Sequence, residues 1–303
     1  MKNVLGIDTS NYTTSIGIYS EDGIVVDNRK MLSVERGKRG LRQSDALFEH
    51  IKNLPLLLES IKGHSINGVC VSTKPRPCEG SYMPVFLGGY SVASSIASSL
   101  NVPLVETSHQ EGHIEAALDS INKSFKEFIA VHISGGTTEV LHVTKEDRYL
   151  IDIIGESLDI SVGQLVDRVG VKMGFNFPAG IEVDSLACNA TSELIIPSKV
   201  KNFHMNFSGQ ETMAVRFLDS GYNKEEIAYA VMKCVSKSLE KVCINLKKQY
   251  NIPIVFIGGV SSSIFLQRHF KRNGMASIHF AKGKYGADNG VGVAKIGFKR
   301  LFE

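Results

Sequence analysis

The sequence has no tryptophan, only eight prolines and only five cysteines among 303 residues. The cysteines are Cys70, Cys78, Cys188, Cys234 and Cys243. Their number is odd and none forms a CxxC pair, which argues against a disulfide framework or a zinc ribbon and favours buried free thiols. No run of about 18 apolar residues occurs, so we expect no transmembrane helix. Asp8 follows the first apolar residues too early for a signal-peptide core, and we therefore expect a cytoplasmic protein.

The excess of positive charge is also small. A formal net charge of +3 does not by itself indicate a nucleic-acid-binding protein. Basic residues and glycines alternate between Arg36 and Arg42, which predicts a loop. This loop is either a solvated connection or one that faces an anion or RNA.

A strand–turn–strand pattern occurs twice. An apolar strand at Val4–Asp8 is followed by a Ser/Thr/Asn-rich turn and an alternating strand at Ser15–Tyr19. Phe128–Ile133, a polar turn and Glu139–Val143 repeat the pattern. Each copy leads into further helices and strands, which predicts a duplicated α/β protein with a cleft between two lobes. We place the N-terminal lobe at 1–105 and the C-terminal lobe at 106–303, with a helical insertion at about 156–225.

Hydrophobic periodicity predicts the remaining elements. Pro55 is expected to kink or divide the first helix. Helices are expected at 45–61, 88–100, 108–119, 159–173, 184–191, 225–249, 264–272 and 290–301, and strands at 68–72, 102–105, 254–257 and 277–280.

Three polar turns have the composition of phosphate-binding loops. They contain Thr9, Ser10 and Asn11; Ser134, Gly135, Gly136, Thr137 and Thr138; and Gly258, Gly259, Val260 and Ser261. Glycines let backbone N–H groups approach phosphate oxygens, and hydroxyls add donors. Any one of these turns could simply reverse the chain. Their order matches the actin, Hsp70 and sugar kinase superfamily, whose members bind ATP between duplicated lobes, and this order predicts a nucleotide cleft.

Two histidines indicate a metal site. His109 and His113 are four residues apart, which on a helix places both imidazoles on one face. Asp288, in a Gly-containing turn near the end of the chain, could supply a hard third ligand. The alternative is that the histidine pair belongs to a solvated helix face.

These motifs together resemble the tRNA threonylcarbamoyladenosine synthase family, long described as O-sialoglycoprotein endopeptidases or glycoproteases. The resemblance runs nearly from end to end. It is carried by Leu5–Ser10, His109–His113, Ile133–Thr138, Gly155–Asp159, Asp167-Arg168, Pro178–Gly180, Asn206–Gly209, Gly258–Ser261 and Asp288–Gly290.

The resemblance implies a two-lobed enzyme that transfers a threonylcarbamoyl group from its adenylate to an adenosine beside the tRNA anticodon. It implies one bound iron or zinc ion, held by His109, His113 and Asp288. It also implies an ATP or adenylate site. The implied nucleotide contacts come from the Ser134–Thr138 loop, Asp167, Gly180, and the loop that runs from Gly258 and Gly259 to Ser263.

Several positions depart from the family pattern. An acidic pair expected after Ser10 is replaced by residues that begin with Asn11, and a Gly-Pro-Gly-Leu turn is replaced by a segment with two cations. These cations, Lys74 and Arg76, are candidates for binding an anion. Three further family residues are replaced by Gln164, Glu211 and Ser263.

One departure adds a possible ligand. His132 stands where archaeal and eukaryotic relatives have a metal-contacting tyrosine, so we expect it as a further candidate ligand. The alternative is a buried histidine that is hydrogen-bonded to the backbone at a strand end.

The sequence therefore favours a divergent threonylcarbamoyl transferase that binds a metal and a nucleotide. The HxxxH pair lacks the glutamate of an HExxH protease, which argues against proteolysis. Two alternatives remain: a non-catalytic ATP-binding regulatory paralogue, and a carbamoyl transferase with a non-tRNA acceptor. The expected partners are an adenine nucleotide, tRNA, and a protein partner or second copy bound through the N-terminal lobe; no membrane partner is expected.

Overall fold

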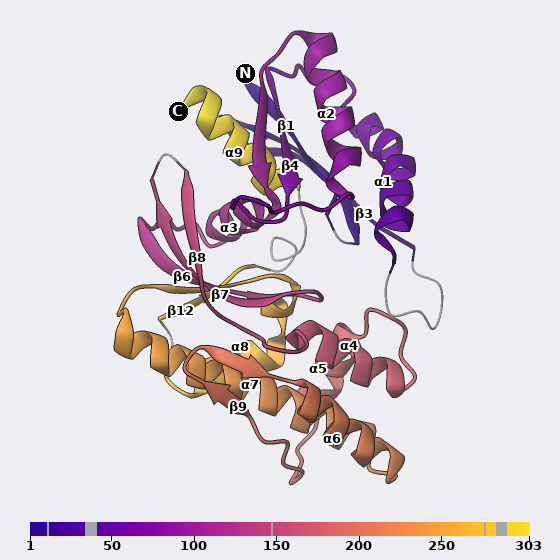
Figure 1. The fold of residues 1–303 in the computed structure, drawn as a ribbon, viewed down its shortest axis with the longest axis vertical. Helices are drawn as coiled ribbons and strands as arrows, with labels where there is room; N and C mark the ends of the chain where they lie inside the picture. Colours follow the sequence, from indigo (N-terminus) through magenta and orange to yellow (C-terminus); the bar gives the residue numbers. More distant parts are fainter. Residues whose placement is uncertain (11, 34–40, 147, 276, 283–289) are drawn as a thin grey trace. The chain divides into compact units, whose positions relative to one another are not determined.

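The computed structural model of the chain describes residues 1–303 apart from 11, 34–40, 147, 276 and 283–289 (Figure 1). Two compact units are present, Met1–Ser124 with Ala287–Glu303, and Phe125–Gly286. This division lies beyond the boundary that we placed at residue 105. The first unit extends further because α3 (His109–Ser120) packs against α9 (Gly290–Phe302), which brings the end of the chain back to the first unit.

The first unit is built on a five-stranded mixed sheet with the order β3-β2-β1-β4-β5. β1, β2 and β3 are antiparallel, whereas β1, β4 and β5 are parallel. The elements of this unit are β1 (Asn3–Asp8), β2 (Thr13–Ser20), β3 (Gly23–Met31), α1 (Gln43–Leu58), η1 (Glu59–Ile61), β4 (Gly68–Lys74), α2 (Phe86–Leu100), β5 (Leu104–Ser108), α3 and α9.

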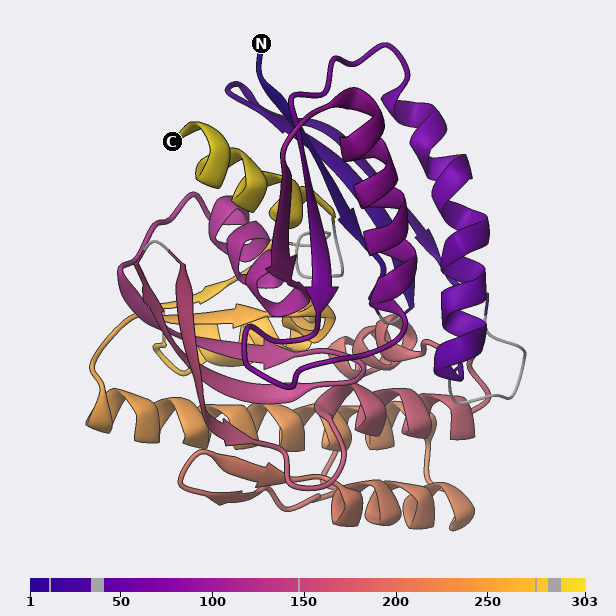
Figure 2. The same cartoon turned by 45° about the horizontal axis from the view of Figure 1, so that its top comes forward.

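Helices cover both faces of this sheet (Figures 1 and 2). Successive strand residues point to opposite faces, so Leu5 and Ile7 of β1 pack under α1 and α2, while Val4 packs under α9. Gly6 lets the α9 backbone approach closely, since a Cβ atom at this position would lie 2.3 Å from the backbone nitrogen of Ala294. The apolar pattern of β1 thus accounts for a strand that is buried on both sides.

Pro55 does not divide the first helix, although division was one of the two outcomes we expected for it. α1 is continuous from Gln43 to Leu58, and a short 3-10 turn extends it. Leu54 and Leu57 are buried against the sheet on either side of the proline. Their burial stabilises the turn by about 1.5–3 kcal/mol for each side chain, which offsets the roughly 3 kcal/mol that an interior proline costs a helix.

The second unit repeats the topology of the first. Its sheet has the order β12-β11-β6-β7-β8, with β6, β7 and β8 antiparallel and β6, β11 and β12 parallel. The predicted duplication is therefore confirmed at the level of strand order and direction. The strands are β6 (Glu127–Ile133), β7 (Thr138–Lys145), β8 (Tyr149–Glu156), β11 (Ile254–Ile257) and β12 (Ile278–Phe280).

The segment between β8 and α7 is only partly helical. Besides helices it contains a short antiparallel hairpin, β9–β10. The remaining elements of the unit are α4 (Val162–Lys172), α5 (Gly180–Cys188), β9 (Lys199–Lys201), β10 (His204–Asn206), α6 (Ser208–Asp219), α7 (Lys224–Gln249), η2 (Gly259–Ser262) and α8 (Ile264–Arg272).

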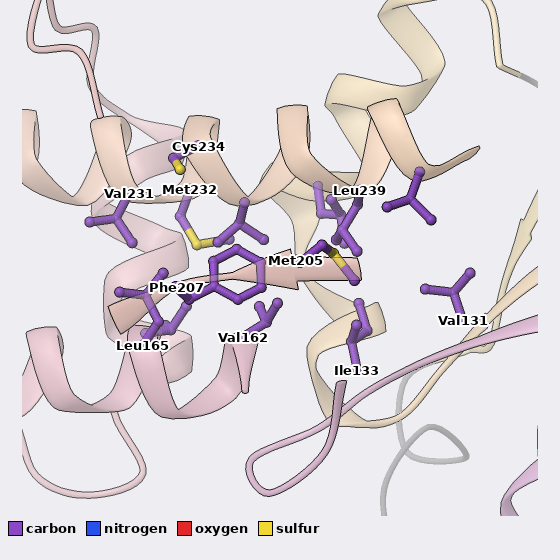
Figure 3. Packing of buried hydrophobic residues seen from close by; sticks show 14 of the residues in the cluster. Val131, Ile133, Val162, Leu165, Met205, Phe207, Val231, Met232, Cys234 and Leu239 are labelled. Carbon is purple, nitrogen blue, oxygen red and sulfur yellow. The ribbon is translucent and has the colours of Figure 1, made fainter. Parts of the chain in front are cut away.

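A large apolar core holds the second unit together (Figure 3). Leu239 of α7 packs on one side of Met205, and Val131 and Ile133 of β6 lie on the other. Phe207, which is fully buried, fills the space between α7 and α4. This core fixes the end of β6 and the start of α4. The predicted Ser134–Thr138 loop directly follows the end of β6.

All five cysteines are free, and Cys70, Cys234 and Cys243 are buried, whereas Cys78 is exposed. Within the described part of the chain, none of the helices combines the length and apolarity that crossing a bilayer requires.

Candidate metal and nucleotide sites

The histidine pair lies at the carboxyl edge of the first sheet. α3 begins directly after β5, and the ends of β1 and β4 lie beside it. Ligand sites of open α/β sheets are typically found at this edge. Ser108 is the N-cap of α3 and forms a capping box with Glu111, which explains why the helix starts at His109. Glu111 also forms an ion pair with Arg300 of α9 at 3.0 Å, which anchors the first turn.

The structure excludes the solvated-face alternative for the pair. His109 is 9% exposed and His113 is 3% exposed. Their Nε2 atoms lie 2.9 Å apart, and the rings meet edge to face. Two nitrogens bound to one zinc ion at about 2.05 Å in tetrahedral geometry would lie roughly 3.3 Å apart. A shift of a few tenths of an ångström would therefore let both rings bind a single ion, and we conclude that the pair fits a divalent metal.

The third expected ligand, Asp288, lies outside the described residues. Among the described residues, no group of three or more His, Cys, Asp and Glu side chains has the geometry of a metal site. The full ligand set stays a prediction.

A carboxylate that the sequence analysis did not assign lies behind His109. Oδ2 of Asp8 lies 3.0 Å from Nδ1 of His109 and accepts a hydrogen bond from the hydroxyl of Ser10 at 2.9 Å, while Ser72 donates to Oδ1. Burial alone raises the pKa of the Asp8 carboxyl, but the electrostatic interaction with His109 and the hydrogen bonds from His109 and Ser72 outweigh it, so this pKa lies below its ordinary value. The sequence signal was an acid at the end of a buried strand, but its partner is 101 positions away.

The candidate anion-binding residues of the first unit lie near the same carboxyl edge of the sheet. Thr9 is buried; its hydroxyl donates to the carbonyl of Val85 at 3.2 Å and accepts from the Gly89 amide at 3.1 Å. Lys74 pairs with Ser108 in the β4–β5 register, and the following carbonyl, of Pro75, accepts the Gln110 amide at 3.0 Å.

The two cations therefore lie in a segment that is bonded to the start of α3. The backbone amide of Arg76 donates to the Ser81 hydroxyl at 3.0 Å. The anion-binding roles of Thr9, Ser10, Lys74 and Arg76 stay predictions. Asn11, and most of the basic loop between Arg36 and Arg42, lie outside the described residues.

In the second unit, the Ser134–Thr138 turn joins β6 to β7. The Ser134 hydroxyl accepts the Thr137 amide at 3.1 Å, and the Thr138 hydroxyl accepts the Val162 amide at 2.8 Å. The N-cap of α4, Ser161, donates to the carbonyl of Gly135 at 3.0 Å. The turn is therefore bonded to the start of α4. A Cβ atom on Gly135 or Gly136 would meet no described atom within 4 Å, so their backbone is open to a ligand.

Asp167 and Gly180 are neighbours, as a shared nucleotide site requires. Oδ1 of Asp167, on α4, accepts the Ala179 amide at 2.9 Å, and α5 begins at Gly180. A Cβ atom on Gly180 would lie 3.9 Å from this same oxygen. Asp167 is 8% exposed, and burial raises the pKa of its carboxyl. The nucleotide-binding roles of Asp167 and Gly180 stay predictions.

The third loop follows β11. Gly258 has a φ of +91° and lies against the end of β6, while a Cβ atom on Gly259 would meet no atom of the described residues within 4 Å. Ser263 is the N-cap of α8, and its hydroxyl donates to Asp184 of α5. Asp184 also accepts the amides of Ile264 at 2.9 Å and Phe265 at 3.2 Å. The sequence analysis did not assign Asp184, because its partners lie about 80 positions away.

His132 lies in the second unit, where it is 5% exposed. Its ring is next to Gly258, since a Cβ atom at that position would lie 2.9 Å from its Cδ2. The histidine pair belongs to the first unit, so ligation by His132 stays a prediction.

Two departures from the family pattern have local structural partners. Glu211 of α6 forms an ion pair with Arg168 of α4 at 3.1 Å. Gln164 completes a capping box with Ser161 at the start of α4. The Glu211 charge is thus paired with Arg168, and the neutral Gln164 side chain helps to cap α4.

Comparison with solved structures supports the fold. The chain matches full-length HypF in a phosphate- and nucleotide-bound form, with a TM-score of 0.65 and 15% identity over 100% of this chain, and it spans 47% of that protein. It also matches the activator of 2-hydroxyisocaproyl-CoA dehydratase from Clostridium difficile with bound ADPNP, with a TM-score of 0.61 and 16% identity over 98% of this chain and 94% of that one. The fold is therefore of the actin-like ASKHA type, as the sequence predicted.

Sequence comparison is more specific. The chain is 31% identical to the tRNA N6-adenosine threonylcarbamoyltransferase of Sulfurihydrogenibium sp. (strain YO3AOP1), over 99% of this chain and 91% of the relative. It is 32% identical to the enzyme of the same name from Persephonella marina (strain DSM 14350 / EX-H1), over 99% and 90%. Residues 45–295 match the TsaD family model. The chain therefore belongs to the TsaD family, the tRNA N6-adenosine threonylcarbamoyltransferases.

Proposed function

We propose that this protein binds one iron or zinc ion and an adenine nucleotide, and that it transfers a threonylcarbamoyl group from threonylcarbamoyl-adenylate to an adenosine of tRNA. Family membership over nearly the whole chain supports the transferase activity. The observation that carries the metal site is the buried histidine pair, whose Nε2 atoms face each other at 2.9 Å.

The residues of the second unit would bind the adenylate. The open backbone of the Ser134–Thr138 turn suits the phosphate, because its glycines leave the amides accessible. The Asp167 carboxylate suits the ribose hydroxyls, and Gly180 allows the backbone to approach the nucleoside. Gly258, Gly259 and Ser263 would border the nucleotide from the side of β11.

In the first unit, His109 and His113, together with Asp288, would hold the metal. Bound there, the ion would act as a Lewis acid for the carbamoyl carbonyl and as a template for the acceptor. Lys74 and Arg76 would attract an anionic group, since their segment is bonded to the start of α3. In this proposal the protein side chains mainly bind and orient the reactants.

The test is incubation of the purified protein with threonylcarbamoyl-adenylate and unmodified tRNA, followed by mass spectrometry of the digested nucleosides. We expect modified adenosine with the wild type and at least a tenfold loss with His109→Ala or His113→Ala. Elemental analysis of protein purified under mild conditions would identify the ion.

Two outcomes would favour the alternatives. ATP or adenylate binding without modification of tRNA or any other acceptor would indicate a regulatory paralogue. Transfer of the group to a small molecule but not to tRNA would indicate a carbamoyl transferase with another acceptor. The replaced residues that begin at Asn11 motivate both tests.

We also propose that the first unit binds a protein partner or a second copy through α1 and α2. Large apolar side chains are exposed on these helices, including Phe48, Ile51 and Leu56 on α1 and Leu87 and Tyr90 on α2. α1 and α2 pack against each other, and exposed apolar patches are typical of protein interfaces. Light scattering of the wild type and of Phe48→Ser/Leu87→Ser tests this proposal. A wild-type dimer that the double substitution dissociates supports self-association, whereas a monomeric wild type leaves only the partner.

A further inference from the structure

The carboxylate behind the histidine pair is fixed from three sides. Asp8 is the last residue of β1 and is 1% exposed. Its Oδ1 accepts the hydroxyl of Ser72 on β4, and its Oδ2 accepts the hydroxyl of Ser10. A carboxylate that accepts hydrogen bonds on both oxygens cannot rotate freely, so the orientation of Oδ2 toward α3 is determined by the sheet.

The contact with His109 determines which ring nitrogen carries the proton. An ionised carboxylate only accepts hydrogen bonds, and therefore Nδ1 of His109, 3.0 Å from Oδ2 of Asp8, is the donor. In a neutral imidazole the other nitrogen then carries no proton and has a lone pair in the plane of the ring. This nitrogen, Nε2, is the one that faces Nε2 of His113.

We propose that Asp8 is a positioning residue for the predicted metal site: it fixes the ring and the tautomer of His109 so that the Nε2 lone pair points to the ion. The proposal rests on the metal binding proposed above. Asp8 contacts the opposite side of the imidazole from Nε2, so it acts through His109 and is not itself a ligand.

A purely structural role is the competing explanation. Asp8 also connects β1 to β4 and to α3, and its loss would destabilise the first unit in either case. A matched control is Glu115, another buried carboxylate, which lies on α3 itself and forms an ion pair with Lys299 of α9. Glu115→Gln removes a buried charge from the same helix and leaves Asp8 and His109 in place.

The experiment titrates the full-length, metal-free protein with Zn²⁺ by calorimetry for the wild type, Asp8→Asn and Glu115→Gln. Removal of a carboxylate behind a metal-binding histidine typically weakens metal affinity about 10–100-fold. We expect a loss of this size for Asp8→Asn and a change of less than about threefold for Glu115→Gln. Circular dichroism and urea unfolding establish that each variant is folded.

A second readout is independent of the metal. Nitrogen-15 spectra of histidine-labelled, metal-free protein distinguish protonated Nδ1 from protonated Nε2. We expect protonated Nδ1 on His109 in the wild type and an increased share of protonated Nε2 in Asp8→Asn, because an amide can donate to Nδ1. If Asp8→Asn is unfolded, Asp8→Glu and the wild-type spectrum supply the comparison.

Several results would overturn the proposal: unchanged Zn²⁺ affinity in Asp8→Asn, an equal loss in Glu115→Gln, or protonated Nε2 on His109 in the wild type. If the wild type binds no Zn²⁺, the metal part of the proposed function fails, and with it the positioning role. Failure of transfer to tRNA with intact Zn²⁺ binding would instead leave the role of Asp8 standing.

Discussion

Two adjacent glycines in the loop after β11 should respond very differently to the same substitution. Gly258 has φ +91° and ψ 164°, a conformation that is almost restricted to glycine. A Cβ atom there would lie 2.3 Å from the carbonyl oxygen of Ile133, well below any real contact. Gly259 has no described atom within 4 Å of such a Cβ and no left-handed φ.

The structure sets the size of the effect. For Gly258→Ala, the backbone conformation costs about 1–3 kcal/mol, and the overlap with β6 costs about another 1–3 kcal/mol. The free energy of unfolding of the second unit should fall by about 2–6 kcal/mol in total. A unit of this size loses about 2–4 °C in Tm for each kcal/mol. Gly259→Ala should change the free energy of unfolding by less than about 0.5 kcal/mol.

Urea and thermal unfolding of the ligand-free protein measure these values, and ATP titration provides a second readout. Because Gly258→Ala displaces the end of β6 or the loop, it should also weaken nucleotide binding if the loop contacts the nucleotide. Equal and small losses of stability in both variants would refute the close approach of Gly258 to Ile133. A large loss only in Gly259→Ala would mean that the loop has another conformation.

Three further predictions concern ionisable groups. Asp167→Asn removes a carboxyl whose pKa is raised by burial, so at neutral pH the ligand-free variant should be at least as stable as the wild type in urea unfolding. This advantage should vanish as the pH falls below the pKa of the Asp167 carboxyl, and the affinity for adenylate should fall about 10–150-fold in calorimetry. Asp159→Ala removes an acceptor for the amides of Phe207 and Ser208 and should lower the free energy of unfolding in urea by about 1 kcal/mol. Burial opposes ionisation of Asp159, but hydrogen bonds hold the pKa of its carboxyl well below the usual range, so this stabilisation is present above about pH 4 and is lost in stronger acid. Iodoacetamide at neutral pH should label Cys78 in the native protein and leave the buried cysteines unmodified until it is unfolded, as peptide mass spectrometry would reveal.

Most of the fold could be predicted from hydrophobic periodicity. The helices at 225–249 and 264–272 were placed within one residue of α7 and α8. α6 was not placed individually: its apolar face is short, with Met213, Ala214, Phe217 and Leu218 on the core and polar residues in the first turn. β8 was missed because it exposes Leu150 and Ile153 at the sheet edge, which obscures the alternation of a half-buried strand.

The sequence predicted the individual loops of the candidate site, but not the hydrogen bonds that connect them. The turns at Ser134 and Gly258 were recognisable because glycines and hydroxyls follow buried strands. The bond between Asp184 and Ser263 was not recognisable, since an acid inside a helix is usually a surface charge. The loops were thus predictable individually, and their mutual bonding was not.

By itself, the sequence determined the duplicated α/β architecture, the family and the histidine pair, because these depend on local periodicity and on short motifs with fixed spacing. Only the tertiary structure decided that Asp8 lies behind His109 and that Asp167 lies at the start of α5. The physical reason is that these contacts form where parallel strands and helix termini from distant parts of the chain meet, and such meetings are set by the packing of the whole sheet.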